Sequence, residues 1–337
     1  MSPLRCPRCG ARYDPPARFC IRDGFPLVSD GASPRTTPRP ALHRTGEVAA
    51  ASVRPGDPAS GLTGRRLDGR FLLERRIGEG GMACVYRARD GERGEVVAIK
   101  VLGARLKEDS EAMARLRREA DLAMRLDHPN VCRIIALGEA GGLPYLVMPY
   151  LDGETLSKRE CRSGPMAPSL AIPLLIQLAR GLGHAHQAGV LHRDLKPENV
   201  MLVGGADGER AVVMDFGLAK EALAGPEVTR LTQTGVVLGT PEFMSPEQIR
   251  GQPIDPRSDI FALGVLGFEL LTGRLPFEGN TGQETMLAHL TGQPLRLRQV
   301  RGDLPESLER VIATAIAHRP RDRYQSMQEF ESALAAL

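Results

Sequence analysis

The chain has 337 residues, 42% of them hydrophobic, so it can bury at least one large core and is long enough for two or three folding units. Its net charge of +3 is unevenly spread, because the first 66 residues hold eleven Arg, no Lys and only five acidic residues. The apolar runs are too short or too interrupted to span a bilayer, and the polar start MSPLRCPRCG does not look like a signal segment. We therefore expect a cytoplasmic protein without a membrane segment. Solubility explains the basic arm more simply than nucleic acid or acidic partners do.

Residues 1–28 form a small Cys-bearing unit, CPRCGARYDPPARFCIRDGFPL, with the spacing C-x2-C, ten residues, C-x2-D. It resembles a zinc ribbon with Cys6, Cys9, Cys20 and Asp23 as ligands, where Asp23 stands at the place of the usual fourth Cys. A unit this small has too little core to fold without metal, which favours Zn²⁺. A water ligand in place of Asp23 and a degenerate metal-free fold remain alternatives. Such a unit suits protein docking or oligomerisation, and its sparse aromatics argue against nucleic-acid binding. The other cysteines are scattered and predicted to pack inertly: Cys84, Cys132 and Cys161.

Residues 29–66 are rich in Pro, Gly, Ser, Thr and Ala, which predicts a disordered, flexible linker. From Phe71, short β-type runs surround one helical stretch, and helical patterns dominate after Ser169. The predicted fold class is α+β, with a small sheet-rich lobe (71–151) followed by a larger helical lobe (152–337).

The run IGEGGMACV places three glycines, Gly78, Gly80 and Gly81, at a turn between two predicted strands. Backbone N–H groups there can approach an anion without obstruction by side chains. The following strand ends in VAIK, so the ammonium of Lys100 enters a protected space and needs a negative partner.

A helix predicted from about residue 110 to 126 offers that partner in Glu119. This carboxylate lies on the apolar stripe, three residues after Leu116 and four before Ala123. The alternative is that Glu119 belongs to a solvated charge cluster with its neighbours Arg117 and Arg118.

Further along, HRDLKPEN (192–199) holds a carboxylate, an ammonium and a carboxamide in one polar turn: Asp194, Lys196 and Asn199. This combination indicates charge management around a polyanion. Another buried-type strand, AVVMDFG, ends in Asp215, whose carboxylate can face the same turn. Hard oxygen ligands of this kind suit Mg²⁺.

With these motifs in order, followed by SPE at 245–247 and DIFALG at 259–264, residues 71–337 resemble a complete eukaryotic-type (Hanks-type) protein kinase domain of the serine/threonine kind also found in bacteria. The DLKPEN and GTPEFMSPE segments are similar to Ser/Thr kinases rather than tyrosine kinases. The resemblance implies transfer of the γ-phosphoryl group of ATP to protein hydroxyls, with a role in signal transduction. In such a site Asp194 orients the acceptor hydroxyl and takes its proton, while Lys196 contacts the γ-phosphate. Asn199 and Asp215 share magnesium, and Lys100, held by Glu119, grips the α- and β-phosphates.

The resemblance also implies a nucleotide pocket. Met148 takes the gatekeeper position, and the adenine bonds to the carbonyl of Pro149 and the N–H of Leu151, below Val85 and Ala98. Pro149 departs from the usual Glu but keeps the carbonyl that is read, and Ala83 replaces the third glycine but keeps its N–H. The loop residues expected to cover the phosphates are Ile77, Gly78, Glu79, Gly80, Gly81, Met82, Ala83, Cys84 and Val85.

Regulation is expected at Arg193, because a cation beside the catalytic Asp is costly to bury unless an anion meets it. Thr232 and Thr234 align with autophosphorylated threonines of similar bacterial kinases, with self-association as the route. Thr240 matches the substrate-facing threonine that bonds toward Asp194 and Lys196. Solvated loop hydroxyls are the alternative for each threonine. Glu247 is expected to pair structurally with Arg323.

Two further interpretations stay open. The first is a pseudokinase scaffold that binds nucleotide or a partner through the kinase domain and docks through the ribbon-like unit. The second makes that unit the main function and the kinase its regulator. Because all five groups of the phosphoryl-transfer set are present, the active kinase is the favoured prediction: Lys100, Glu119, Asp194, Asn199 and Asp215.

Overall fold

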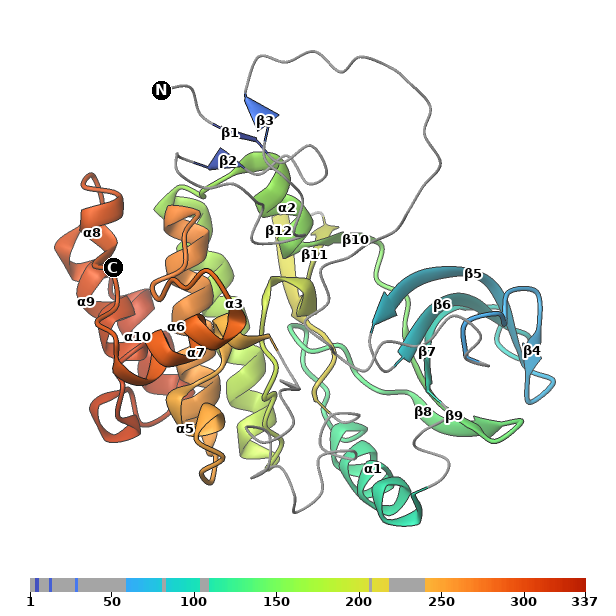
Figure 1. Ribbon diagram of the computed structural model, residues 1–337. Coiled ribbons are helices and arrows are strands. Elements are labelled where there is room, and N and C mark those ends of the chain that lie inside the picture. The colour runs from blue at the N-terminus through green and yellow to red at the C-terminus, as the bar shows by residue number, and fades with distance from the viewer. Residues whose placement is uncertain are drawn as a thin grey trace.

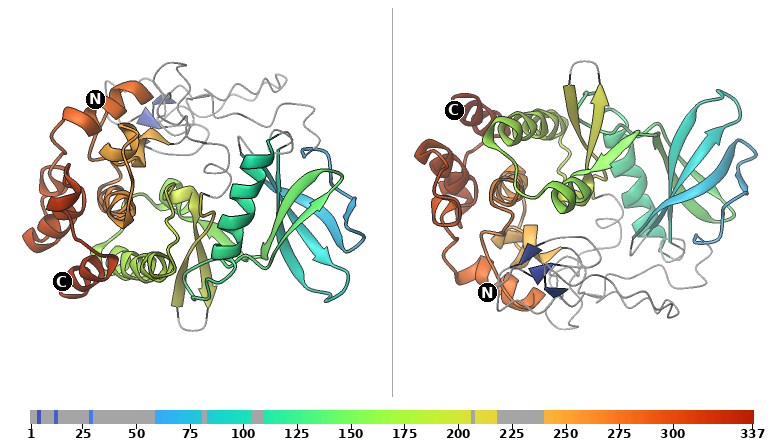
Figure 2. Two further views of the ribbon diagram at one scale, coloured as in Figure 1. Left: turned by 90° about the horizontal axis from the view of Figure 1, so that it is seen from below. Right: turned by 90° about the horizontal axis from the view of Figure 1, so that it is seen from above.

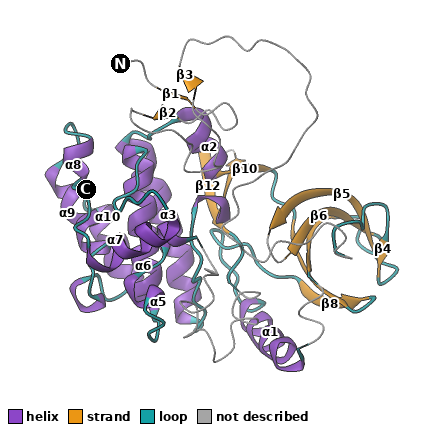
Figure 3. Cartoon of the chain, viewed as in Figure 1, coloured by secondary structure: helices purple, strands orange, loops and turns teal. Residues whose placement is uncertain are grey.

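In the computed structural model the chain forms a strand-rich lobe and a helical lobe; Figure 3 colours the strands orange and the helices purple. The structure describes residues 59–80, 83–103, 109–205, 208–217 and 240–337, together with three two-residue strands at 4–5, 12–13 and 28–29. These three strands, β1 (Leu4–Arg5), β2 (Arg12–Tyr13) and β3 (Val28–Ser29), pair antiparallel in the order β2-β1-β3. None of the helices in the described ranges is both long and apolar enough to cross a membrane.

The strand-rich lobe is one curled antiparallel sheet of six strands in the order β4-β5-β6-β7-β9-β8 (Figure 1). Alternating burial along β5 and β6 puts Leu73, Tyr86 and Ala88 into its core. The strands are β4 (Arg66–Leu67), β5 (Phe71–Gly80), β6 (Ala83–Asp90), β7 (Val96–Leu102), β8 (Ala136–Ala140) and β9 (Leu143–Pro149).

This lobe already includes Ala59, ahead of Phe71, where the sequence predicted the lobe to start. Tyr86 donates its hydroxyl hydrogen to the Ala59 carbonyl (2.7 Å), and the N–H of Leu62 donates to the same hydroxyl (3.4 Å). Ala59, Leu62 and Leu67 are all buried in the sheet core. The composition of the predicted linker hid these contacts, because within it only Ala59 and Leu62, spread among Gly and polar residues, make them.

Helix α1 (Ser110–Ala123) accompanies the sheet. The Asp109 side chain caps it by accepting from the Ala112 N–H (2.9 Å). Its buried stripe is the predicted one: Ala112, Leu116, Ala120 and Ala123.

The helical lobe is built around α6 (Pro256–Thr272), which is buried on all sides from Ser258 onward, as expected for a central core helix. At Gly264 an added Cβ would lie 2.8 Å from Ala315, so close helix packing requires glycine there. The surrounding helices are α2 (Leu156–Ser163), α3 (Pro168–Gln187), α5 (Pro246–Ile249), α7 (Gly282–Thr291), α8 (Leu297–Val300), α9 (Glu306–Ala315) and α10 (Met327–Ala335).

A small sheet of β10 (Gly153–Thr155), β11 (Val200–Gly205) and β12 (Gly208–Val213) joins the two lobes. The β11–β12 hairpin contacts α3 through β12 and lies beside it in Figure 2. Val213 exchanges backbone hydrogen bonds with the segment after α1: its carbonyl accepts from the Cys132 N–H (2.8 Å), and its N–H donates to the Asn130 carbonyl (2.9 Å). The segments 192–199 and 214–217, at the ends of this sheet, are thereby held between the lobes.

Candidate active site

The backbone of the turn at 192–199 is hydrogen-bonded by Asp259, which lies in the first turn of α6. One oxygen of this buried carboxylate accepts from the N–H of His192 (2.8 Å), and the other accepts from the N–H of Arg193 (2.9 Å). Burial alone would raise the pKa of Asp259, but the hydrogen bond with His186 and the one from the N–H of His192 lower it below its ordinary value. Asp259 therefore stays ionised and holds the backbone of the turn.

His192 is fully buried and supports the turn. Its Nε2 donates to the Met214 carbonyl (2.8 Å), and its ring lies against Phe216. Burial lowers the pKa of His192, so the imidazole is neutral at physiological pH. The imidazole links the turn to the strand end that carries Asp215.

The three polar groups of the turn lie within contact of one another. Lys196 Nζ is 3.4 Å from Asp194 Oδ2. The Asn199 amide donates to the Asp194 carbonyl (2.8 Å) and approaches its Oδ2 (3.4 Å). Lys196 also donates to Thr240 Oγ1 (2.9 Å), a contact that the sequence predicted. One turn thus holds a carboxylate, an ammonium and an amide together, with the Thr240 hydroxyl beside them.

Asp215 comes to the same place from the end of β12. The N–H of Met214 donates to the Asn199 carbonyl (2.8 Å), so Asp215 follows directly beside Asn199. Both Asp215 (φ 55°) and Arg193 (φ 64°) adopt the left-handed region, which costs free energy for residues other than glycine. This strain occurs at two residues that the sequence assigned to the site.

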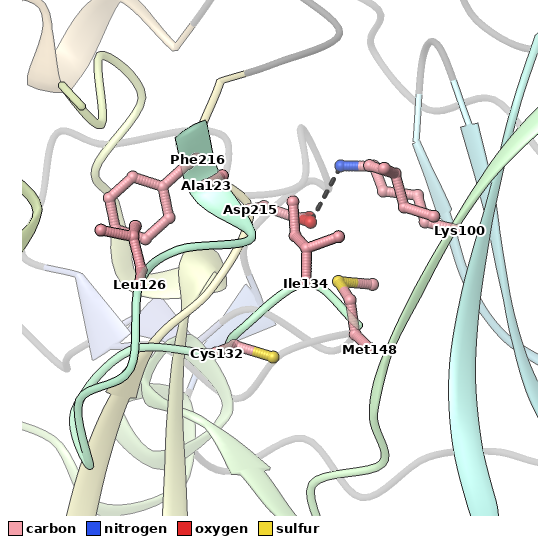
Figure 4. Close-up of a pocket in the computed structure, with 9 residues that line it drawn as sticks. Lys100, Ala123, Leu126, Cys132, Ile134, Met148, Asp215 and Phe216 are labelled. Atoms are coloured by element: carbon pink, nitrogen blue, oxygen red, sulfur yellow. Dashed lines mark ion pairs between the residues drawn. The ribbon is translucent and has the colours of Figure 1, made fainter. Parts of the chain in front are cut away.

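The expected pair between Lys100 and Glu119 is not formed. Within the described residues Lys100 makes its ion pair with Asp215 (Nζ to Oδ1, 2.9 Å; Figure 4). Glu119 instead acts on Arg193: burial lowers the pKa of that guanidinium, and the charge of Glu119 opposes the shift. Helical spacing correctly put Glu119 on the inner side of α1, but it could not specify how α1 is placed relative to β7.

Behind Met148 lies a small cavity of about 20 Å³, with Lys100 and Asp215 at its polar side (Figure 4). Burial, and to a lesser extent the charge of Asp215, raises the pKa of the Cys132 thiol in its wall to about 12, so the thiol stays protonated. Cys84 is fully buried with Tyr86 in the sheet core, in agreement with the predicted packing role. The cavity is lined by Lys100, Ala123, Leu126, Cys132, Ile134, Leu146, Met148, Asp215 and Phe216.

An apolar cluster between the lobes contains the residues predicted to contact a base. Val85, Ala98, Met148 and Leu151 come from the sheet and the segment after it, and Pro149 ends β9 opposite Val97. Sequence reasoning missed the residues that meet them from the other lobe. The missed residues are Met201, Val212 and Met214. The alternation of side chains along the strands after Asn199 and before Asp215 places them on one face of the hairpin, and this pattern could have predicted them.

The glycine-rich hairpin is formed by β5 and β6, with Gly78 opposite Val85, Glu79 opposite Cys84 and Gly80 opposite Ala83. Ile77 is exposed at its edge. Several predicted site residues lie outside the described residues: Gly81, Met82, Thr232, Thr234, Cys6, Cys9, Cys20 and Asp23.

The structural pair predicted between Glu247 and Arg323 is confirmed. Both side chains are buried and joined by two bonds, of 2.7 Å (Nη1 to Oε1) and 3.0 Å (Nη2 to Oε2). Hydrogen bonds from Arg323 lower the pKa of Glu247 against the opposing effect of burial. This pair ties the start of α5 to the segment before α10 and supports the site from outside.

Comparison with known proteins agrees with this geometry. Residues 71–334 match the family described as protein kinase domain. The serine/threonine-protein kinase PrkC of Bacillus subtilis is 40% identical over 271 residues, 80% of this chain and 41% of that protein. The kinase pkn2 of Myxococcus xanthus is 42% identical over 273 residues, 80% of this chain and 32% of that protein. The chain thus spans less than half the length of these relatives.

Among solved structures, the crystal structure of the Mycobacterium tuberculosis PknI kinase domain is similar, with a TM-score of 0.64 and 27% identity. The likeness covers 81% of this chain and 98% of that one. It extends over both lobes, so the fold and the sequence family agree. The chain belongs to the protein kinase family.

Proposed function

We propose that the protein is a serine/threonine protein kinase that transfers the γ-phosphoryl group of ATP to Ser or Thr hydroxyls of proteins. The observation that carries the proposal is the contact of Asp194, Lys196 and Asn199 in one turn, with Asp215 and Lys100 facing it. Relatives named serine/threonine-protein kinase at about 40% identity support the choice of acceptor.

In the proposed mechanism the side chains position the reactants and neutralise charge. Asp194 accepts the proton of the incoming hydroxyl, and Lys196, 3.4 Å away, neutralises the γ-phosphate oxygens. Lys100 leaves Asp215 for the α- and β-phosphates, and Glu119 becomes its carboxylate partner. The donation of Lys196 to Thr240 supports a role for this hydroxyl in aligning the substrate.

The oxygens of Asn199 and Asp215 are the proposed magnesium ligands. The donor set fits: both are hard oxygen donors, and the bond between Met214 and Asn199 keeps them adjacent. A bound magnesium ion would supply neutralisation of phosphate oxygens. For the base, Val85 and Ala98 provide one apolar wall and Met201 and Met214 the other, beside the carbonyl of Pro149 and the N–H of Leu151.

Activation by autophosphorylation is part of the proposal. Arg193 is partly buried, and its pKa is lowered by burial, so an added anion would stabilise its charge. Thr232 and Thr234 are the proposed phosphoacceptors, reached through transient self-association.

Radiolabel transfer from ATP to a generic protein substrate tests the main proposal. Asp194→Asn is expected to lower kcat by at least about 100-fold, the usual contribution of a general base, while the affinity for ATP stays within about threefold. The matched control is Asp303→Asn, an exposed carboxylate on the helical lobe whose contact is with Arg301. Equal labelling by Asp194→Asn and wild type would refute the assignment. Nucleotide binding without any transfer would favour the pseudokinase scaffold.

For the amino-terminal unit we propose a zinc site of Cys6, Cys9, Cys20 and Asp23 that serves protein docking in the cytoplasm. Support comes from backbone pairing: β1 and β2 form a hairpin whose connection contains Cys6 and Cys9, and the chain returns to β1 through β3 after Cys20 and Asp23. Metal analysis of the purified full chain is expected to give one zinc per chain, lost in Cys20→Ser. A metal-free wild-type protein prepared without chelator would refute the site.

A further inference from the structure

Outside the proposed active site, the strand-rich lobe carries a groove of about 440 Å³. Its lining comes from both edges of the curled sheet. One side is formed by the β4–β5 and β6–β7 turns, and the other by β8 and β9. None of the residues assigned to phosphoryl transfer lines it. Its apolar lining includes Phe71, Val97, Ile135, Tyr145 and Val147.

The rim of the groove is acidic. It contains four carboxylates, Asp68, Asp90, Glu92 and Glu95, against two guanidinium groups, which leaves a net charge of −2. The two cations are Arg70 and Arg93.

Arg70 is committed to the groove wall. It binds Asp90 through two hydrogen bonds (2.9 and 2.6 Å) and reaches Glu92 with a third nitrogen (2.8 Å). The hydrogen bond from Arg70 lowers the pKa of Asp90 to about 2, so this carboxylate is ionised at neutral pH. One guanidinium thus serves two carboxylates, and the excess negative charge stays at the rim.

Asp68 is held in place by contacts within the same groove wall. Its backbone adopts a positive φ of 48°, and its carboxylate accepts a hydrogen bond from the buried Tyr145 hydroxyl. Burial, followed by this bond, raises the pKa of Tyr145, so the hydroxyl remains a donor. Glu92 and Glu95, on the turn between β6 and β7, are exposed.

The amino-terminal arm offers a complementary ligand within the same chain. Residues 31–46, GASPRTTPRPALHRTG, contain Arg35, Arg39 and Arg44 and no acidic residue. Proline rings and Leu42 supply apolar groups between the arginines, in a composition that favours an extended conformation. Such segments bind grooves that combine apolar walls with a charged rim.

Chain length and attachment allow this contact. Downstream of the arm, Ala59 is buried in the same apolar cluster as Phe71, Tyr145 and Val147 of the groove. Ala59 follows Arg44 by fifteen positions, and an extended chain of that length spans about 50 Å.

We propose that residues 31–46 dock in cis into this groove, with the arginines at the carboxylate rim and the apolar residues against its walls. Docking keeps the amino-terminal unit beside the strand-rich lobe. The inference does not depend on the proposed kinase activity, since no residue of that site takes part.

Hydrogen exchange of the full chain tests the contact. In wild type, amides 135–138 are expected to exchange at least threefold more slowly than in the variant Arg35→Glu/Arg39→Glu/Arg44→Glu. Glu92→Lys/Glu95→Lys is expected to lose the protection as well, and its fold should persist because Arg70 retains Asp90. A variant that carries both the Arg→Glu changes in the arm and the Glu→Lys changes in the groove should regain the protection, because opposite charges then face each other again. The control Glu278→Lys/Asp303→Lys, which breaks two exposed ion pairs elsewhere, should leave it unchanged.

A labelled peptide of residues 31–46 provides the second measurement. The peptide should bind the full-chain variant Arg35→Glu/Arg39→Glu/Arg44→Glu at least tenfold more tightly than wild type, because in wild type the arm competes at high effective concentration. Added salt should weaken the binding of the peptide. Equal binding to both proteins, or binding that ignores Glu92→Lys/Glu95→Lys, would overturn the proposal. Protection that disappears on dilution would also overturn it, because a second copy would then occupy the groove.

Discussion

At the scale of single residues, the carboxylate that orders the catalytic turn belongs to Asp259 and takes no part in the proposed chemistry. It binds two successive backbone N–H groups, of His192 and Arg193, at 2.8 and 2.9 Å. The motif DIFALG pointed to this segment, but the sequence could not say that its first residue lies beneath the turn. Buried partners more than 60 positions apart determine that role.

His289 illustrates the same dependence on burial and leads to a pH prediction. It is fully buried on α7, donates from Nδ1 to the Met244 carbonyl (2.8 Å) and lies against Phe277. Burial lowers its pKa to about 4, and the nearby His318 adds to this shift. Because the unfolded chain binds this proton near pH 6.5, the stabilisation is complete above that pH and declines as pH falls toward 4.

Between pH 7.5 and pH 5, wild type is therefore expected to lose about 2 kcal/mol more unfolding free energy than His289→Gln, measured by urea unfolding. The comparison cancels the contribution of His318, which both proteins retain. Parallel pH profiles for the two proteins would contradict the assignment.

At the scale of elements, α1 shows that helical periodicity predicts which side chains are buried but not which partners they contact. The stripe Ala112, Leu116, Ala120 and Ala123 is buried as predicted, since it follows from helical spacing alone. The partner of Glu119 does not follow from spacing, because it depends on the placement of α1 against β7 and the catalytic turn. In this structure Lys100 contacts Asp215, and Glu119 acts on Arg193.

If phosphoryl transfer requires Glu119 to move to Lys100, Glu119→Gln should lower kcat/KM for ATP by about tenfold or more. The unfolding free energy should change by less than about 1 kcal/mol, because within the described residues Glu119 forms no ion pair with Lys100. Glu111→Gln, on the exposed first turn of the same helix, is the control. Unchanged kinetics in Glu119→Gln would mean that the pair plays no part in the working enzyme.

At the scale of the whole molecule, the folded strand-rich lobe includes Ala59, within the segment that composition assigned to a linker. Composition predicted a linker through residue 66, yet Ala59 and Leu62 are 0% and 7% exposed, as buried as strand residues. The lobe is thus closed by a segment that looks like linker when read alone.

A fragment of residues 59–337 is expected to unfold within about 1 kcal/mol of the full chain. A fragment of residues 71–337 should lose about 3 to 5 kcal/mol, because two buried leucines leave the core and the Tyr86 hydroxyl loses the Ala59 carbonyl. Urea unfolding followed by circular dichroism measures both. Equal unfolding free energies of the two fragments would show that the contacts of residues 59–67 with the sheet do not stabilise the lobe.

The sequence by itself determined the order of the motifs, the division into a strand-rich and a helical lobe, and the residue types at the site, because these depend on local periodicity and on chemistry carried by single side chains. Only the tertiary structure decided that Lys100 pairs with Asp215, that Met201 and Met214 complete the apolar cluster, and that an acidic groove lies between the two edges of the sheet. Those features are distances between segments far apart in the chain, and packing of the whole molecule sets them.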